Sequence, residues 1–408
     1  MSWIKKTNLL PLLTFALITL ASLEIFSYCL VRMNLLLVNE TPMVYRNVFG
    51  TDVISVAGEY AWRTERDVWG AWHIPNARAS SNGTACGQVE YRSNEVGARD
   101  AEFSHEAKAK QFILLGDSFA EGYNVGYEDT AQRLIEEEVG AELLNFGAAG
   151  NFGPLQYWLI YERLAKQYKH DGVVVFFLPD NDFTDNDYNY WSELGRSYAG
   201  FYNEGKGERY RPYYRQVSEG NYDFFIPENA RKWAHPTTSF TAHPKVWRGW
   251  AAFPKDYFWV MNSLRTLKLV LLSRKIREYQ SESTPSGPKD VYSGYFDASQ
   301  SQQSAAVYFI DKIIMNATAK NILLVSIPRP EDFARVDSGM QRKEMLWWNS
   351  FRTAKERLGK QVVFLDLLDY KPTNISELFN SCDGHWSPVG NKWAAEIVSA
   401  QIRKMKID

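Results

Sequence analysis

The sequence has few cysteines and no pattern that would hold a structural metal ion. Only three cysteines occur among its 408 residues, Cys29, Cys86 and Cys382. No C-x-x-C pair or Cys/His cluster indicates a structural zinc site, and we expect neither a metal nor a cofactor. Cys86 and Cys382 can pair in an oxidising compartment, but two unpaired thiols fit the sequence equally well.

The sequence also lacks an excess of charge of either sign. Lys and Arg number 46, Asp and Glu number 48, and the formal net charge is −2. This balance gives no electrostatic reason to expect nucleic acid or an acidic partner. There is no internal repeat, and nothing indicates the oligomeric state. Aromatic residues are abundant instead, at 15% of the chain with 14 tryptophans.

One long apolar run stands at the N-terminus. Residues 9–31 are apolar except for Glu24 and a few hydroxyl residues, and about 20 such residues span a bilayer as a helix. Lys5 and Lys6 precede the run, which favours a cytosolic N-terminus and an exported remainder. A cleaved signal peptide, cut near Ala21-Ser22, is the alternative. The apolar run continues past that site, so we favour a membrane anchor over residues 1–33 and a periplasmic or extracellular catalytic domain.

The region that follows, residues 34–110, has few long helical patterns. Residues 88–92 alternate like a half-buried strand. We expect short strands and loops that pack against the main domain, and their sequence indicates no function.

From residue 111 to residue 408 apolar strands alternate with helical patterns. The expected strands are 112–115, 143–146, 173–178, 322–327 and 362–367, and the expected helices are 127–139, 155–168, 302–318, 340–358 and 389–404. Such alternation predicts right-handed crossovers and a parallel sheet covered on both faces. We therefore expect a flavodoxin-like three-layer α/β/α sandwich with five parallel strands.

An aromatic-rich insertion over residues 183–301 interrupts this pattern. Its tyrosines and tryptophans have faces that can stack on sugar rings, but a separate hydrophobic core is the favoured interpretation. Residues 256–279 predict a helix with one apolar stripe. Residues 281–289 are rich in Ser, Pro and Gly, which is typical of a linker.

Polar blocks follow the carboxyl ends of the predicted strands. They are Gly116-Asp117-Ser118, Asn145 to Asn151, Pro179-Asp180-Asn181-Asp182 and Asp383-Gly384-His385-Trp386. Open α/β sheets bind ligands at this edge, so we expect the blocks to gather there.

The residue types in these blocks suit nucleophilic catalysis. A serine hydroxyl needs a base to take its proton, and histidine is the natural base near neutral pH. Asp383 can orient the imidazole of His385. Each residue also has a plain structural interpretation, because Ser118 can cap a helix, Asn181 and Gly150 can shape turns, and His385 can lie on the surface. All four together, in this order, favour the catalytic interpretation.

The four blocks resemble those of the SGNH (GDSL-like) hydrolases over roughly residues 112–405. The resemblance implies that Ser118 is the nucleophile, that Ser118, Gly150 and Asn181 supply the oxyanion hole, and that His385 and Asp383 complete the triad. Two departures stand out. Pro179 replaces the glycine often found two residues before the asparagine, and the aspartate precedes the histidine by two residues where three are usual.

The Asp-x-His-Trp block is similar to that of SGNH proteins of the alginate O-acetylation type. The SGNH resemblance as a whole implies a serine-dependent esterase that acts through an acyl-enzyme and removes O-acyl groups, such as acetyl, from a surface or secreted glycan. The Asp-x-His-Trp similarity adds weight to the first alternative, which is transfer of the acyl group onto a glycan hydroxyl. A non-catalytic glycan-binding or assembly protein is the second alternative. The substrate-binding residues are not evident.

Overall fold

The computed structural model of the chain describes residues 9–32, 54–55, 63–66, 68–80, 89–104, 110–197, 211–228, 258–261, 264, 292–358, 360–381 and 383–405. Cys86 and Cys382 lie outside the described residues, and so does the predicted linker 281–289. Of the predicted helix 256–279, only residues 258–261 and 264 are described.

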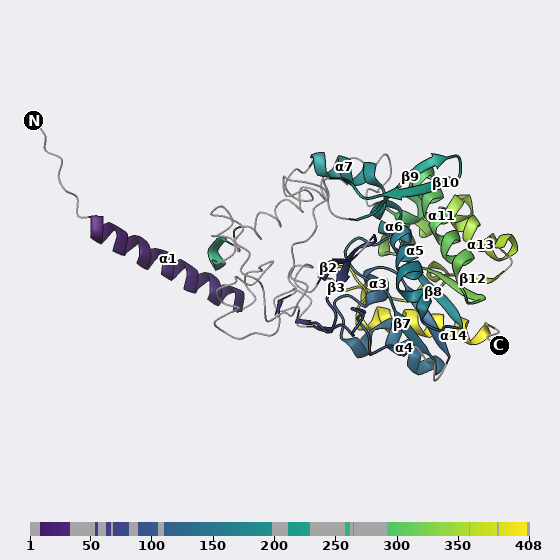
Figure 1. The fold of residues 1–408 in the computed structure, drawn as a ribbon, viewed down its shortest axis with the longest axis horizontal. Coiled ribbons are helices and arrows are strands. Elements are labelled where there is room, and N and C mark those ends of the chain that lie inside the picture. The colour runs from purple at the N-terminus through teal and green to yellow at the C-terminus, as the bar shows by residue number, and fades with distance from the viewer. Residues whose placement is uncertain are drawn as a thin grey trace, which may run out of the picture.

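A five-stranded parallel sheet forms the centre of the domain (Figure 1). Its strands are β6 (Gln111–Leu115), β7 (Glu142–Asn145), β8 (Gly172–Phe177), β11 (Asn321–Ser326) and β12 (Gln361–Asp366). They lie in the order β12-β11-β8-β6-β7, and each neighbouring pair is parallel. Counted along the chain, this is the flavodoxin-like order 2-1-3-4-5. The predicted fold class is confirmed.

Helices cover both faces of the sheet (Figure 1). On one face, α4 (Ala131–Val139) packs against α14 (Pro388–Lys404). On the other face, α11 (Gln300–Asn316) contacts both α5 (Pro154–Arg163) and α13 (Leu346–Leu358). Four of them, α4, α5, α11 and α13, lie in the four crossovers between the strands, and α14 follows the last strand.

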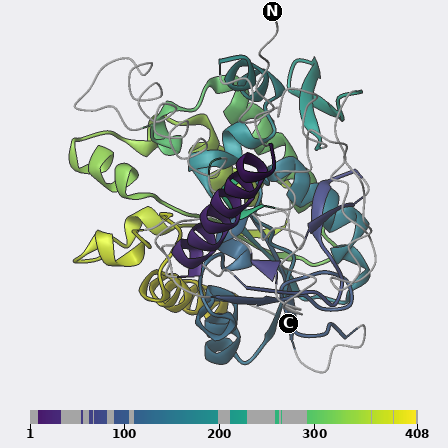
Figure 2. The same cartoon turned by 90° about the vertical axis from the view of Figure 1, so that its left-hand side faces the viewer.

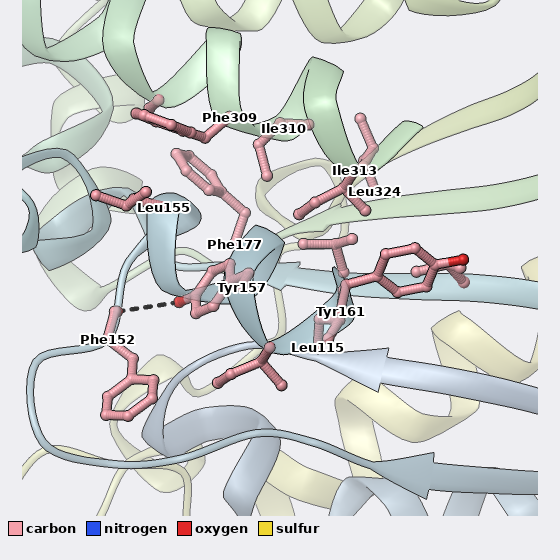
Figure 3. Close-up of a cluster of buried hydrophobic side chains, with 14 of the residues drawn as sticks. Leu115, Phe152, Leu155, Tyr157, Tyr161, Phe177, Phe309, Ile310, Ile313 and Leu324 are labelled. Atoms are coloured by element: carbon pink, nitrogen blue, oxygen red, sulfur yellow. Dashed lines mark hydrogen bonds between the residues drawn. The ribbon is translucent and has the colours of Figure 1, made fainter. Parts of the chain in front are cut away.

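The strands are buried on both faces, which explains their unbroken apolar runs. Ile113 and Leu115 belong to one core cluster, and their neighbours Phe112 and Leu114 belong to the other. Figure 3 shows the first cluster, in which Leu115, Phe177 and Leu324 of the sheet face Phe309, Ile310 and Ile313 of α11. Burying one such side chain contributes about 1.5–3 kcal/mol.

Two short helices after strands were not predicted. They are α6 (Pro179–Asp185), which follows β8, and α12 (Pro330–Asp337), which follows β11. Both have proline at the first helical position, where its missing N–H costs nothing. Each is too short to show a clear apolar period, so the sequence pattern predicts neither.

The boundaries of the other elements differ slightly from the prediction. The 127–139 pattern divides into a 3₁₀ turn, η1 (Tyr127–Asp129), and α4, and the 155–168 pattern into α5 and η2 (Ala165–Gln167). The expected helix 340–358 is η3 (Arg342–Glu344) followed by α13. The remaining short elements are α3 (Ser118–Glu121), α10 (Gly294–Asp297), η4 (Leu367–Asp369) and η5 (Ile375–Leu378).

The segment before the sheet forms two small sheets. β1 (Ile54–Ser55), β4 (Arg78–Ser80) and β5 (Glu90–Arg92) form one, and β2 (Arg63–Arg66) with β3 (Gly70–His73) forms the other. Trp69, Trp72 and Phe103 belong to the same core cluster as Leu115. This segment therefore packs directly onto the main domain.

The apolar N-terminal run is a helix, α1 (Leu9–Arg32), that lies apart from the sheet in the view of Figure 1 and stands in front of the domain in the view of Figure 2. Its Pro11–Leu30 stretch of 20 residues is long and apolar enough to cross a membrane, and a signal sequence meets the same criteria. The Glu24 carboxylate accepts the backbone N–H groups of Trp259 and Val260 at 2.5 and 3.2 Å. The one charge in this run is thus hydrogen-bonded to the short helical turn at 259–261.

The described part of the insertion consists of α7 (Tyr188–Ser197) and a hairpin of β9 (Tyr213–Ser218) and β10 (Asn221–Phe225). The ring of Tyr188 lies 5.4 Å from that of Tyr213 and 5.3 Å from that of Phe225, measured between centroids. Tyr222 is buried in the main core. These rings pack on one another and on the domain, which supports the core interpretation for this part of the insertion.

Candidate active site

The turn after β6 presents Ser118 at the edge of the sheet. Asp117 caps α3 by accepting the N–H of Phe119 at 2.9 Å, so Ser118 becomes the first residue of that helix. Its N–H belongs to the first helical turn, where N–H groups have no helical acceptor. Gly116 is required here because a Cβ would lie 2.6 Å from Ala120 Cβ and 3.0 Å from the Phe176 carbonyl oxygen.

This edge is the topological switch point of the sheet. β6 has β7 on one side and β8 on the other, so the chain leaves β6 and β8 in opposite directions along the sheet. A crevice forms outside the carboxyl ends of such neighbouring strands, and ligands bind there. Ser118 follows β6 and Asn181 follows β8, so both lie beside this crevice.

Ser118, His385 and Asp383 form one hydrogen-bonded chain. His385 Nε2 lies 2.8 Å from Ser118 Oγ, and His385 Nδ1 lies 2.8 Å from Asp383 Oδ2. In the tautomer with the proton on Nδ1, Nε2 is free to accept the serine proton. These are the distances expected between nucleophile, base and orienting acid.

Asp383 stays ionised in this arrangement. Burial by itself raises the pKa of its carboxyl, but hydrogen bonds from His385 and Asn124 outweigh burial and hold the pKa below its ordinary value. An ionised Asp383 can stabilise the imidazolium that forms when His385 takes the serine proton.

Two aromatic rings flank the imidazole. The Phe119 and Tyr123 rings lie 5.2 and 4.9 Å from the His385 ring, measured between centroids. The next residue, Trp386, is buried against Phe119 and Phe176 of β8. The tryptophan of the Asp-x-His-Trp block therefore anchors the histidine loop to the sheet.

Asn181 lies in the first turn of α6, beside the serine turn. Its Nδ2 lies 3.5 Å from Asp117 Oδ2, and Ser118 Oγ lies 3.5 Å from the same oxygen. Pro179, the departure from the family pattern, is the first residue of α6. Its ring fixes the backbone angle for a helix start, so the asparagine emerges from a helical turn and not from a loop.

Gly150 lies in the loop after β7, with a positive φ of 110°. Two bonds hold this loop on the turn that carries Ser118: the Ala148 N–H donates to the Gly116 carbonyl at 3.2 Å, and the Ala149 N–H donates to the Glu121 carboxylate of α3. The oxyanion role of Gly150 stays a prediction that the sequence resemblance implies.

The other acids of the blocks have structural contacts. Asp182 accepts the Leu178 N–H at 2.9 Å and the Tyr157 hydroxyl at 2.6 Å, which secures the start of α6. Burial raises the pKa of Asp182 well above its ordinary value and that of Asp117 to about 6. The hydrogen bonds of both acids stabilise the turns that follow β6 and β8.

Sequence reasoning missed two residues that contact the loop of Asp383 and His385. Asn124 donates its amide to Asp383 Oδ2. Arg329 donates to the Gly384 carbonyl and lies 3.7 Å from Asp180 Oδ2. A third residue, His73, contacts α3, where its Nε2 lies 3.4 Å from Glu121 Oε2 and both side chains are fully buried. These residues belong to none of the four polar blocks, so no local signal marked them.

No protein-family model and no curated protein matches the sequence. The chain is similar to a solved lipase/acylhydrolase from Enterococcus faecalis at 10% identity and a TM-score of 0.35, covering 73% of this chain and 98% of that one. It is also similar to a carbohydrate esterase family 2 enzyme with a carbohydrate-binding domain from Corynascus thermopiles, at 14% identity and a TM-score of 0.35. That match covers 76% of this chain and 73% of the other.

A member of the lipolytic G-D-S-L family from Veillonella parvula is similar at 11% identity and a TM-score of 0.32, over 73% of this chain and all of that one. TM-scores of 0.35 or below decide nothing about activity. The strand order of this chain is flavodoxin-like by its own geometry.

Proposed function

We propose that the protein is a serine-dependent ester hydrolase that acts through an acyl-enzyme. The observation that carries this proposal is the chain of 2.8 Å contacts from Ser118 Oγ through His385 to Asp383. It lies at the switch point of the sheet, where the fold binds ligands. A buried serine with no reacting role would not need a base and an acid aligned behind it.

The proposed reaction proceeds in two halves. Ser118 Oγ attacks the ester carbonyl carbon while His385 Nε2 takes the proton of the serine hydroxyl. The ester carbonyl oxygen then becomes an oxyanion, which the Ser118 and Gly150 amides and the Asn181 side chain stabilise. The ester C–O bond then breaks and His385 returns the proton to the leaving alcohol. Water repeats the sequence on the acyl-enzyme and releases the acid and free Ser118.

The direct test is turnover of p-nitrophenyl acetate, together with labelling by a fluorophosphonate. We expect Ser118→Ala to abolish labelling and to lower kcat by at least about 1000-fold without changing Tm, because no other group replaces the nucleophile. His385→Ala should lose a similar factor, and Asp383→Ala less. Ser338→Ala, at an exposed serine after α12, is the matched control. Labelling that survives Ser118→Ala would refute the assignment.

We infer that the natural substrate is an O-acylated glycan, on the strength of the Asp-x-His-Trp resemblance. The two-residue spacing of Asp383 and His385 still allows a 2.8 Å contact between Asp383 Oδ2 and His385 Nδ1, which supports the proposed triad despite the departure from the usual spacing. The same block supports acyl transfer as the second candidate, in which a sugar hydroxyl replaces water in the second half. Product analysis with an acceptor polysaccharide distinguishes the two reactions.

We further propose that α1 anchors the catalytic domain outside the cytosol. The supporting features are the apolar helix and the lysines before it. A reporter fused to the C-terminus should be active only outside the cytosol, and a full-length chain should remain in the membrane fraction. Release of a shortened soluble chain would instead indicate a cleaved signal peptide.

A further inference from the structure

Besides its bonds to His385, Asp383 accepts a hydrogen bond from outside its own loop. The Asn124 amide nitrogen donates to Asp383 Oδ2, the same oxygen that faces His385 Nδ1. Asn124 is buried, at 8% exposed, although it lies in the loop just beyond α3. Its φ of 60° is in the left-handed region, which a residue other than glycine adopts only where the surroundings require it.

Tyr91 determines which way the Asn124 amide points. The Tyr91 hydroxyl accepts the Asn124 backbone N–H at 2.8 Å and donates to Asn124 Oδ1 at 3.1 Å. With the amide oxygen bonded to Tyr91, the amide nitrogen must face Asp383. Tyr91 lies in β5 and is 2% exposed, so bulk water does not compete for its hydroxyl.

Arg99 contacts both Tyr91 and the loop that carries Asn124. Its guanidinium carbon lies 4.2 Å from the centroid of the Tyr91 ring, close enough for a cation–π contact. The same guanidinium donates to the carbonyl of Glu121 at 3.1 Å, to that of Gly122, and to that of Val125 at 2.7 Å. These carbonyls lie on both sides of Asn124, so a buried arginine fixes the loop that carries it.

We propose that Asn124 and Tyr91 are positioning residues that hold the acid of the triad, so that the segment before the sheet completes the active site. The proposal rests on the proposed esterase function. The Asp383 side chain is 20% exposed. Its carboxylate faces His385 Nδ1 and accepts the His385 backbone N–H at 3.1 Å, but both groups belong to the same loop as Asp383. The Asn124 amide ties the carboxylate to a separate part of the chain, so it limits how far Asp383 and its loop can turn toward water. Misplacement of a catalytic group by about 1 Å can cost on the order of 100-fold in rate.

The test uses three variants of the full-length protein with p-nitrophenyl acetate. Asn124→Gly removes the amide yet keeps a residue that accepts a positive φ. We expect it to lower kcat about 10- to 100-fold with little change in KM. Tyr91→Phe keeps the ring over Arg99 and removes only the hydroxyl, so it should lower kcat in the same direction and by less.

The third variant, Asn124→Asp, distinguishes positioning from a merely structural role. A second carboxylate beside Asp383 favours the protonated imidazole, so the acid limb of the kcat/KM profile should move to higher pH. A loss of kcat with no shift of the acid limb of the kcat/KM profile in this variant would overturn the proposal. That result would mean that position 124 affects the shape of the loop but does not interact with Asp383 and His385. Wild-type kcat and an unmoved limb in all three variants would overturn it too.

The readouts separate this proposal from the proposed function. If the wild type neither hydrolyses the ester nor labels with a fluorophosphonate, the esterase assignment fails. If the wild type does both and the variants match it, only the positioning role fails. Asn221→Ala, at an exposed asparagine of the β9–β10 hairpin, is the matched control and should match the wild type. Tm and circular dichroism establish that each variant is folded.

Discussion

At the scale of single residues, the site depends on side chains that reach it from different loops. Arg329 shows how they are tied together. Its guanidinium donates to the Gly384 carbonyl, between Asp383 and His385, and lies 3.7 Å from Asp180 Oδ2, next to Asn181. One cation therefore bridges the histidine loop and the start of α6.

Asn181 is the residue whose proposed role is easiest to isolate. We expect Asn181→Ala to lower kcat for p-nitrophenyl acetate about 100- to 1000-fold with little change in KM, because an oxyanion donor acts mainly in the transition state. The Asn181 amide nitrogen and Ser118 Oγ both lie 3.5 Å from Asp117 Oδ2. Because the substitution leaves Ser118 and His385 unchanged, the variant should still react with a fluorophosphonate, but more slowly.

Asn189→Ala provides the comparison for that measurement. Asn189 is an exposed asparagine of the next helix, α7, and its loss should leave kcat within about twofold of wild type, as is usual for surface positions. An Asn181→Ala variant that is as active as Asn189→Ala would remove Asn181 from the oxyanion hole.

At the scale of secondary structure, the position of α6 is set by a close contact with α10. A Cβ built on Gly294 would lie 1.9 Å from the Pro179 carbonyl oxygen and 2.4 Å from the Asp180 nitrogen. The two backbones can approach this closely only because position 294 has no side chain. The insertion ends at α10, so its end packs on the helix turn that carries Asn181.

This contact predicts a remote effect on catalysis. Gly294→Ala should push the start of α6 away, destabilise the protein by about 1–3 kcal/mol and lower kcat at least about tenfold, because Asn181 moves with its helix. Urea denaturation and p-nitrophenyl acetate kinetics measure the two effects.

Gly126→Ala is the control for the added methyl group. A Cβ there meets only the end of the flexible Asp129 side chain, at 3.2 Å, so activity and stability should stay close to wild type. Full activity in Gly294→Ala would show that α6 tolerates the displacement and that its position does not control the site.

At the scale of the whole molecule, buried acids set the dependence of stability on pH. Burial raises the pKa of Asp117 to about 6, that of Asp100 to about 7 and that of Asp332 to about 8, from an ordinary value of 3.8. Between about pH 4 and pH 8 the folded chain holds protons that the unfolded chain has lost. The stabilisation from these three groups is complete below their unfolded pKa and is lost as the pH rises through their folded values.

We therefore expect Tm to be higher at about pH 5.5 than at about pH 8.5. Asp383 acts in the opposite sense, since its lowered pKa adds stability that is lost as the pH falls through that value. Scanning calorimetry across this range checks the prediction. Asp332→Asn should flatten the upper part of the curve, because it removes the group with the highest of the three values. A Tm that rises steadily toward pH 8.5 would contradict the prediction.

The sequence by itself was enough to predict the sheet, its covering helices and the sheet edge where Ser118, Asn181 and His385 gather. The physical reason is that strands buried on both faces need unbroken apolar runs, and parallel strands place their carboxyl ends on one side. These patterns are local, so each can be recognised within a short segment of the sequence. The helices α6 and α12 are too short to show a helical period, so the sequence pattern does not predict them.

Only the tertiary structure decided how the triad is held. Asn124 and Asp383 are 259 positions apart, and Arg329 is 55 positions from Gly384, so neither contact belongs to a local pattern. It also decided that the described aromatic rings of the insertion pack on one another. Aromatic residues look the same in a sequence whether they stack on a ligand or fill a core, and only their burial tells the two apart. Polar partners brought together by the fold depend on chain geometry over hundreds of residues, and no short stretch of sequence encodes that geometry.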